Sequence, residues 1–217
     1  MFKEIISLVV KDLKGEWRSK QSINGIILYL FSTILVLYYS LVKVERFLWT
    51  GVLWILLIFL SVNTISGSFN RDIKTRHWYY YTLAHPLAIY FAKLIYNILL
   101  LSSMTMVSLS LLSIFFNTPI QDWSVFLLTL ACSVFGIAAI FTFISLLATK
   151  ANDQGTLMSI LATPLIFPIL MSGSRLCMIS IGILQDSGYI KDIYSIFAID
   201  ILAISLSIIL FPILWRD

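Results

Sequence analysis

Long runs without a charged residue dominate the chain after its first twenty positions. Five of these runs, 21–42, 47–70, 94–121, 123–149 and 154–174, contain no Asp, Glu, Lys or Arg, and a sixth, about 193–214, is interrupted only by Asp200. A helix needs about 20 apolar residues to cross a bilayer, and backbone polar groups in lipid must be bonded within their own segment. The pattern predicts an all-α integral membrane protein with one transmembrane domain, 1–217. Its six transmembrane helices are expected at about 22–42, 47–69, 94–117, 123–149, 155–174 and 193–214.

Residues 1–20 have a different pattern, in which apolar and charged side chains alternate at helical spacing. Placed around a helix, the apolar residues fall in one arc, and most charged residues fall opposite them. This segment is therefore expected to form an amphipathic helix in the membrane interface. A secretory signal is disfavoured, because about twenty mixed residues precede any apolar core and no small-residue cleavage site follows. The apolar arc contains Phe2, Ile5, Ile6, Val9, Val10, Leu13 and Trp17, and the opposite side contains Lys3, Glu4, Lys11, Lys14 and Arg18.

Composition and charge distribution agree with a membrane protein and predict its orientation. The chain is 59% hydrophobic and 12% charged, with a mean hydropathy of +0.95, whereas soluble domains have about 25% charged residues. Six crossings place both termini on one side, and basic residues collect on the cytoplasmic side. With cytoplasmic termini, eleven of the 15 basic residues lie inside and four, Lys43, Arg46, Arg175 and Lys191, lie outside. Both termini are therefore expected in the cytoplasm.

The segment between the second and third predicted spans is the one long connection. It is cytoplasmic in the predicted topology, and its charges and aromatic residues exceed what a turn needs, which favours a docking function. The alternative is an aromatic belt at headgroup depth. The candidate docking residues are Arg71, Asp72, Lys74, Arg76, Trp78, Tyr79, Tyr80, His85 and Pro86.

Sequence signatures of catalysis and metal binding are absent. The chain contains no GxxxxGK[ST] nucleotide loop, no HExxH or GxSxG motif, and no CxxCH haem-attachment motif. Both histidines, His77 and His85, lie in the cytoplasmic connection rather than in a span. Cys132 and Cys177 are too far apart in sequence to suggest a metal site. An intramembrane enzyme is therefore disfavoured, and no catalytic or metal-ligating residue is predicted.

Two features inside the predicted spans stand out. Asp200 is the one intramembrane acid, expected about 10 Å from the outer end of the last helix. A carboxylate costs roughly 2.5–3.5 kcal/mol at the middle of a membrane helix, so Asp200 is expected to face another subunit or a wet crevice. If it has a buried partner instead, Arg175 or Lys191 is the nearest candidate. One acid without an internal repeat disfavours an ion-coupled transporter.

The second feature is the pair Pro164 and Pro168, four residues apart in the fifth span. Each proline removes a backbone donor and crowds the preceding turn, so a kink or a broken helix is expected. Its role is either a static bend or a hinge. The segment 175–192, rich in Gly and Asp, is expected to form an external loop, which would place Cys177 just beyond the membrane.

Three stretches of the chain carry a resemblance to a known family. They are Phe69-Asn70-Arg71-Asp72 followed by His85-Pro86-Leu87 and Lys93, then PLIFPILMSG at 164–173, and the ending FPILWRD. They resemble, in that order, the loop before the third helix, the proline-paired fifth helix and the final helix of the CcmB family, the haem exporter B subunits of cytochrome c biogenesis, which belong to the ABC-2 type permeases. The stretch Ile73 to Trp78 departs from the family pattern, because related loops often carry glycine and glutamate there.

The resemblance implies a non-catalytic permease subunit with an ABC-2 type permease fold in the bacterial inner membrane. It implies ATP hydrolysis on a separate ATPase subunit, CcmA, docked on the loop before the third helix. It also implies a homodimer, together with the membrane proteins CcmC and CcmD and the haem chaperone CcmE, whose haem-loaded form is released by ATP hydrolysis. Haem is a candidate cargo of the complex, while no cofactor is predicted on this chain. The alternative is an ABC-2 permease for a polysaccharide, lipid or drug.

Overall fold

The computed structural model describes residues 2–19, 21–40, 45–65, 86–148, 154–185 and 188–216. All regular secondary structure in these ranges is α-helical, as the sequence predicted. The helices are α1 (Phe2–Ser19), α2 (Gln21–Ser40), α3 (Arg46–Ile65), α5 (Pro86–Phe115), α6 (Trp123–Ala148), α7 (Gln154–Ser180) and α8 (Tyr189–Arg216).

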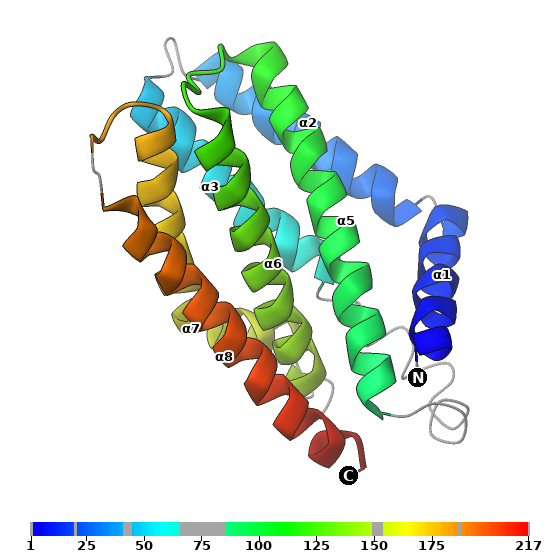
Figure 1. Ribbon diagram of the computed structural model, residues 1–217. Coiled ribbons are helices and arrows are strands. Elements are labelled where there is room, and N and C mark those ends of the chain that lie inside the picture. Colours follow the sequence, from blue (N-terminus) through cyan, green and yellow to red (C-terminus); the bar gives the residue numbers. More distant parts are fainter. Residues whose placement is uncertain are drawn as a thin grey trace.

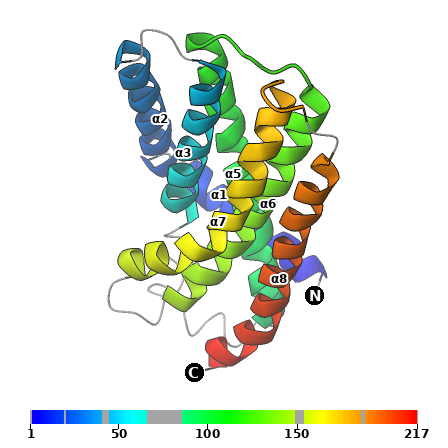
Figure 2. The same ribbon diagram turned by 90° about the vertical axis from the view of Figure 1, so that its left-hand side faces the viewer.

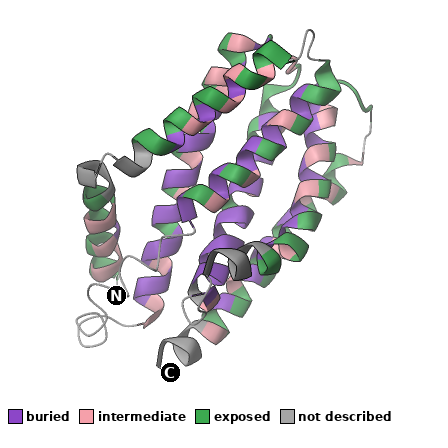
Figure 3. Cartoon of the chain, turned by 180° about the vertical axis from the view of Figure 1, so that it is seen from behind, coloured by how far each residue is buried: buried purple, intermediate pink, exposed green. Residues whose placement is uncertain are grey.

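Helix α6 is the centre of the bundle, and it packs against α3, α5, α7 and α8. Helix α2 lies to one side, in contact with α3 and α5, and α1 packs mainly on α5 (Figures 1 and 2). The buried positions of α3, α5 and α6 face inward, while outward faces are exposed (Figure 3). Such a distribution, with exposed leucine, isoleucine and phenylalanine on the outer helices, is typical of a protein whose outer surface contacts lipid.

Five of the described helices are long and apolar enough to cross a membrane. They contain the stretches Arg46–Ile65, Pro86–Phe115, Trp123–Ser145, Ile160–Ser180 and Tyr189–Leu210. The first expected span corresponds to α2, whose described apolar part, Asn24–Ser40, is shorter. The structure therefore shows a helical membrane protein, and the count of six crossings stays a prediction.

A buried hydrogen bond joins two of the central helices. Asn97 on α5 donates from Nδ2 to Oγ1 of Thr142 on α6 at 2.8 Å, and both side chains are buried. The Thr142 hydroxyl in turn donates to the carbonyl of Ala138 at 2.6 Å. Bonds of this kind hold membrane helices together where the apolar lipid gives no hydrophobic driving force between them.

Three helix boundaries differ from the sequence prediction. Helix α5 begins at Pro86 rather than near 94, α7 continues to Ser180 rather than ending near 174, and α8 begins at Tyr189 rather than near 193. The predicted external loop 175–192 is therefore wrong over most of its length, because only residues between Ser180 and Tyr189 separate the two helices. In each case a charged residue interrupts the apolar run without ending the helix.

The end of the bundle where α5 leads into α6 and α7 leads into α8 is at the top of Figure 1. We call it the outer end, following the charge-based prediction, and the opposite end, near both termini, the inner end. At the outer end Gly182 has a φ of 75°, a conformation that glycine adopts without strain. Its N–H donates to the Ile179 carbonyl and that of Ile183 donates to Met178, both at 3.0 Å. This pattern is a Schellman motif, which terminates α7.

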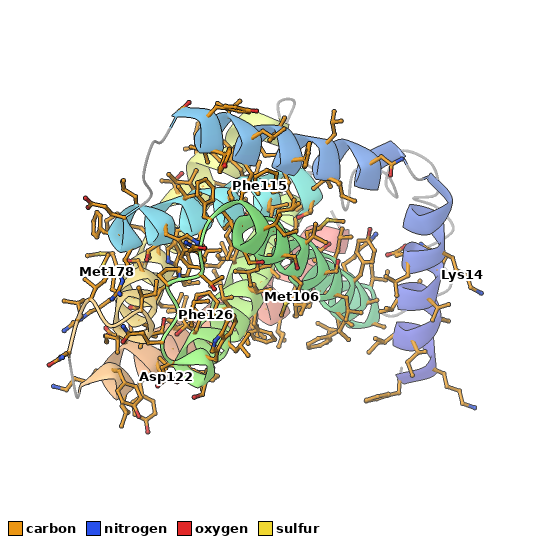
Figure 4. The ribbon with its side chains drawn as sticks, turned by 90° about the horizontal axis from the view of Figure 1, so that it is seen from above. Lys14, Met106, Phe115, Asp122, Phe126 and Met178 are labelled. Atoms are coloured by element: carbon orange, nitrogen blue, oxygen red, sulfur yellow. The ribbon has the colours of Figure 1, made fainter. Side chains whose placement is uncertain are left out.

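The connection before α6 is bonded to the same turn. The N–H groups of Gln121 and Asp122 both donate to the Ser180 carbonyl, at 3.0 and 2.9 Å. We call this pair of bonds the outer clasp. Asp122 also caps α6, because its Oδ1 accepts from the N–H groups of Ser124 at 3.1 Å and Val125 at 3.4 Å. Figure 4 looks down the bundle from this end, with Asp122 labelled just before α6 and Met178 labelled on α7. At the outer end, the start of α6 is thus hydrogen-bonded to the end of α7.

Candidate functional site

The predicted docking residues lie mostly outside the described part of the chain. Pro86 is the exception, and it is the first residue of α5. Proline suits this position because the first helical N–H has no partner within the helix and the φ angle is already set. The predicted docking segment, residues 70–86, therefore leads directly into α5. The residues outside the described ranges are Arg71, Asp72, Lys74, Arg76, Trp78, Tyr79, Tyr80 and His85.

A buried ion pair lies two turns further along α5. The Nζ of Lys93 is 2.9 Å from Oδ2 of Asp12 on α1, and the two side chains are only 8% and 9% exposed. Lys11 approaches the other carboxylate oxygen at 2.9 Å, from a more exposed position. The Lys93 ammonium also lies 5.7 Å from the centroid of the Tyr96 ring. We call Lys93 and Asp12 the α1–α5 pair, and it fixes the amphipathic helix to a membrane span.

Helix α1 forms as the sequence predicted, and its apolar arc is divided between two environments. Val9 is buried and Ile5 is half-buried against the bundle. Phe2, Ile6 and Val10 remain exposed, with Phe2 at 82%. Lys14 points away from the bundle (Figure 4). An exposed apolar stripe beside a charged one suits a helix in the membrane interface.

The two prolines of α7 lie on its exposed face. The chain stays helical through both Pro164 and Pro168, so the helix is not broken. The first turns of α7 run across the bundle and the remainder runs along it (Figure 2). The exposed face of α7 continues toward the outer end with two further apolar side chains, Phe167 and Met171. The proline rings therefore face lipid or another subunit rather than the core of this chain.

Asp200 lies further from the start of its helix than the sequence suggested. It is eleven residues after Tyr189, the first residue of α8, which places it about 17 Å along the helix. This is the middle of the apolar stretch Tyr189–Leu210, which is long enough to cross a membrane. Asp200 is 2% exposed, and the expectation that it faces another subunit or a wet crevice is wrong for this structure.

The nearest predicted partners of Asp200 are engaged elsewhere or lie at the surface. Arg175 Nε is 3.5 Å from Oδ2 of Asp192, at the start of α8. Lys191 is exposed beside it. Both are at least two helical turns from Asp200, because Lys191 and the Arg175 partner Asp192 precede it by nine and eight residues on α8. Neither candidate partner therefore pairs with Asp200 in this structure.

Cys177 also differs from its predicted position. It lies inside α7 and is 1% exposed, instead of beyond the membrane. Cys132 is half-buried on α6. Among the described residues, no group of three His, Cys, Asp or Glu side chains is arranged to hold a metal ion.

Sequence reasoning missed the α1–α5 pair. A usable signal existed, because Asp12 falls at the edge of the apolar arc when the first helix is drawn as a wheel. A carboxylate in that position either faces lipid headgroups or meets a cation from a neighbouring helix. Lys93, just before an uncharged run, was one of several cations that could meet it. Nothing in the sequence indicated which cation would meet it.

Comparison with known protein families gives a match to the CcmB protein family over residues 3–213. No curated protein and no solved structure matches the chain significantly. The family match covers nearly the whole chain, from α1 to the last turns of α8, and the long apolar helices agree with a multi-pass protein of the inner membrane. The chain therefore belongs to the CcmB family, the membrane permease subunits of haem-export ABC transporters in cytochrome c maturation.

Proposed function

We propose that this permease subunit works by mechanical coupling: a separate ATPase, CcmA, docks on residues 70–86 and moves α5 and α1 together. The observation that carries the proposal is the α1–α5 pair, which lies two turns after the end of the docking segment. A buried ion pair with both partners satisfied is costly to separate. Force applied at Pro86 therefore reaches two helices rather than one.

The nature of the docking contact follows from the residue types. Trp78, Tyr79 and Tyr80 supply large side chains that can fill a groove, and Arg71, Asp72, Lys74 and Arg76 can pair across a surface. Buried aromatic anchors usually dominate the binding energy of an interface, while charges at its rim mainly steer the encounter. The aromatic residues are therefore proposed as the anchors.

The proposed cycle requires no haem ligand on this chain. ATP hydrolysis on CcmA drives release of haem-loaded CcmE, with CcmC and CcmD beside a homodimer of this subunit. The contact of Asn97 with Thr142 supports coupling over conduction at that point, because the two buried side chains are hydrogen-bonded to each other rather than lining a path. A bend of α7 at Pro164 and Pro168, which lie inside the helix, is proposed as a hinge. Replacing both prolines by alanine should reduce maturation of cytochrome c at normal expression, and unchanged maturation would remove the hinge from the proposal.

A pull-down of the ATPase tests the docking segment. We expect Tyr79→Ala or Tyr80→Ala to reduce ATPase recovery at least tenfold, as for loss of an anchor worth about 1.4 kcal/mol or more. Lys74→Ala is the matched control in the same segment, with a smaller reduction that fades at high salt. Full recovery with both tyrosine variants, together with altered membrane insertion, would support a headgroup-level aromatic belt instead.

The proposed orientation can be tested with two exposed positions at opposite ends. Gln185 follows the Schellman turn at the outer end, and Lys14 lies on the exposed polar face of α1. Gln185→Cys should react with a membrane-impermeant thiol reagent in intact cells, and Lys14→Cys should react only after the membrane is opened. Native Cys177 is buried and should stay unlabelled in both. The reverse pattern would invert the topology.

A further inference from the structure

The carboxyl of Asp200 occupies space that another helix leaves empty. Gly136 on α6 has no side chain, and a Cβ placed there would collide with Asp200 Oδ1 and lie 3.0 Å from its Cγ. The same Cβ would be 2.8 Å from Cδ1 of Ile169 on α7. The carboxyl is therefore enclosed by the α6 backbone on one side and an aliphatic side chain on the other. These are apolar surroundings for a group that is charged in water.

Neither carboxylate oxygen has a hydrogen-bonding partner among the described residues. Charged and titratable side chains on the helices packed against α8 either have other neighbours or cannot neutralise a carboxylate. Cys132 on α6 is within electrostatic reach of Asp200, but a thiol carries no positive charge. The remaining groups are Arg175 and Cys177 on α7, Tyr90, Lys93 and Tyr96 on α5, and Tyr189, Lys191, Asp192 and Tyr194 on α8 itself.

The two basic side chains in that set, apart from the exposed Lys191, are already paired. Arg175 lies against Asp192 at the outer end, and Lys93 lies against Asp12 near α1. Tyr90 lies beside Ser207 on α8, about two turns from Asp200. No cation on these described elements therefore balances a negative charge at Asp200.

A second buried polar group near this site also lacks a hydrogen-bonding partner within the described part of the chain. Ser133 precedes Gly136 by one helical turn, and its buried Oγ has no bond among the described residues. A Cβ at Gly173 on α7 would be 3.0 Å from this oxygen and 2.7 Å from Cζ2 of Trp54. The indole Nε1 of Trp54 is likewise unpartnered in the described structure. Polar atoms of α3, α6 and α8 thus gather around two glycines in the bundle interior.

We propose that Asp200 is a proton-binding site in the membrane interior, which holds its proton while the carboxyl is packed against Gly136. Burying an ionised carboxylate without a cation is far more costly than burying the neutral acid. Loss of the proton therefore requires α8 to separate from α6, so that water or a cation reaches the carboxylate. By linkage, proton binding favours the packed arrangement of these two helices to the same extent. This inference is independent of the docking segment and of the ATPase.

Infrared spectroscopy of the purified full-length chain in lipid nanodiscs tests the site. The acidic residues number 11, and ordinary carboxyls, with pKa values of about 3.9–4.3, are ionised at about pH 7. We expect the wild type to keep a carbonyl band of a neutral carboxylic acid at that pH, and Asp200→Asn to lose it. Asp192→Asn is the control, because Asp192 is paired with Arg175 and should contribute to the carboxylate band only.

Two results would overturn the proposal. One is loss of a carboxylate band, rather than an acid band, in Asp200→Asn. The other is an acid band that persists unchanged in this variant. If Asp200→Asn fails to fold, the wild type alone decides, with aspartate labelled by carbon-13 at the side-chain carboxyl. The acid band should then shift to lower frequency, and the absence of a shifting acid band excludes a neutral aspartic acid.

Discussion

Two carboxylates, Asp12 and Asp200, are largely shielded from solvent in this chain, and they differ in what lies beside them. Asp12 has Lys93 at 2.9 Å and Lys11 at 2.9 Å. Asp200 has glycine and isoleucine around it, and no bonding partner among the described residues. Asp12 is at the junction of α1 and α5, whereas Asp200 is at the contact of α6 and α8.

The comparison teaches that burial alone does not define what a membrane carboxylate does. A paired carboxylate fixes two helices because separating the ions would leave both uncompensated. An unpaired one makes the contact of its helices depend on a proton, because only the neutral form is compatible with the site. The first arrangement suits a connection that stays closed, and the second suits a connection that opens.

The largest expected effect is loss of one member of the α1–α5 pair. Asp12→Asn removes the carboxylate that lies 2.9 Å from the buried Lys93 ammonium, and we expect the free energy of unfolding to fall by about 3–5 kcal/mol. Reversible unfolding in mixed micelles measures it. The double variant Asp12→Leu with Lys93→Met should recover most of the loss, because it removes both charges. A fall below about 1 kcal/mol in the single variant would mean that the pair is solvated.

A methyl group at Gly136 should have a smaller effect of about 1–3 kcal/mol, because it forces Asp200 and Ile169 to move. The same unfolding measurement applies. Asp200→Ala in the Gly136→Ala background should restore part of the loss by removing the colliding carboxyl. Gly51→Ala on α3 is the control, because no atom lies within 4 Å of its added Cβ. It should be neutral or stabilising by up to about 1 kcal/mol, and an equal loss at both glycines would contradict the packing at Asp200.

The smallest expected effect is at Asp122, an exposed carboxylate that is satisfied by its own helix. The Ser124 hydroxyl, and after it the Val125 N–H, holds the pKa of this carboxyl below its usual value. A lowered pKa means stability that is present above the unfolded-state pKa and is lost as pH falls through the folded-state value. Thermal unfolding of the wild type and Asp122→Asn should therefore converge in acid. A difference that grows on acidification would contradict this sign.

The fold was largely predictable because lipid imposes a simple requirement on sequence. Each crossing needs an uninterrupted apolar run, and five such helices are present in the structure. Boundaries were predicted poorly where a charge was paired in three dimensions. Lys93 and Arg175 ended the apolar runs in sequence, but both lie inside helices because Asp12 and Asp192 compensate them. Pairing across helices is not visible in a hydropathy pattern.

The candidate sites were predictable to a lesser degree. Asp200 was recognisable as the one acid in an apolar span, but its partners were not, because Gly136 is 64 positions earlier in the chain. A glycine in a membrane helix carries no sign of what will occupy the space beside it. The sequence analysis placed Cys177 outside the membrane because the charge of Arg175 suggested that the fifth span ends before it. Helix α7 instead continues to Ser180, so Cys177 lies inside it.

The outer clasp has a mechanical consequence for the central helices. Because Ser180 at the end of α7 accepts two hydrogen bonds from the residues that lead into α6, and only residues 149–153 separate the other end of α6 from the start of α7, these two helices are linked at both ends. Large relative motion within the pair would break one of these links or the packing between the helices. Movement of the bundle is therefore expected between this pair and the other helices, such as α5, which the docking segment enters at the inner end.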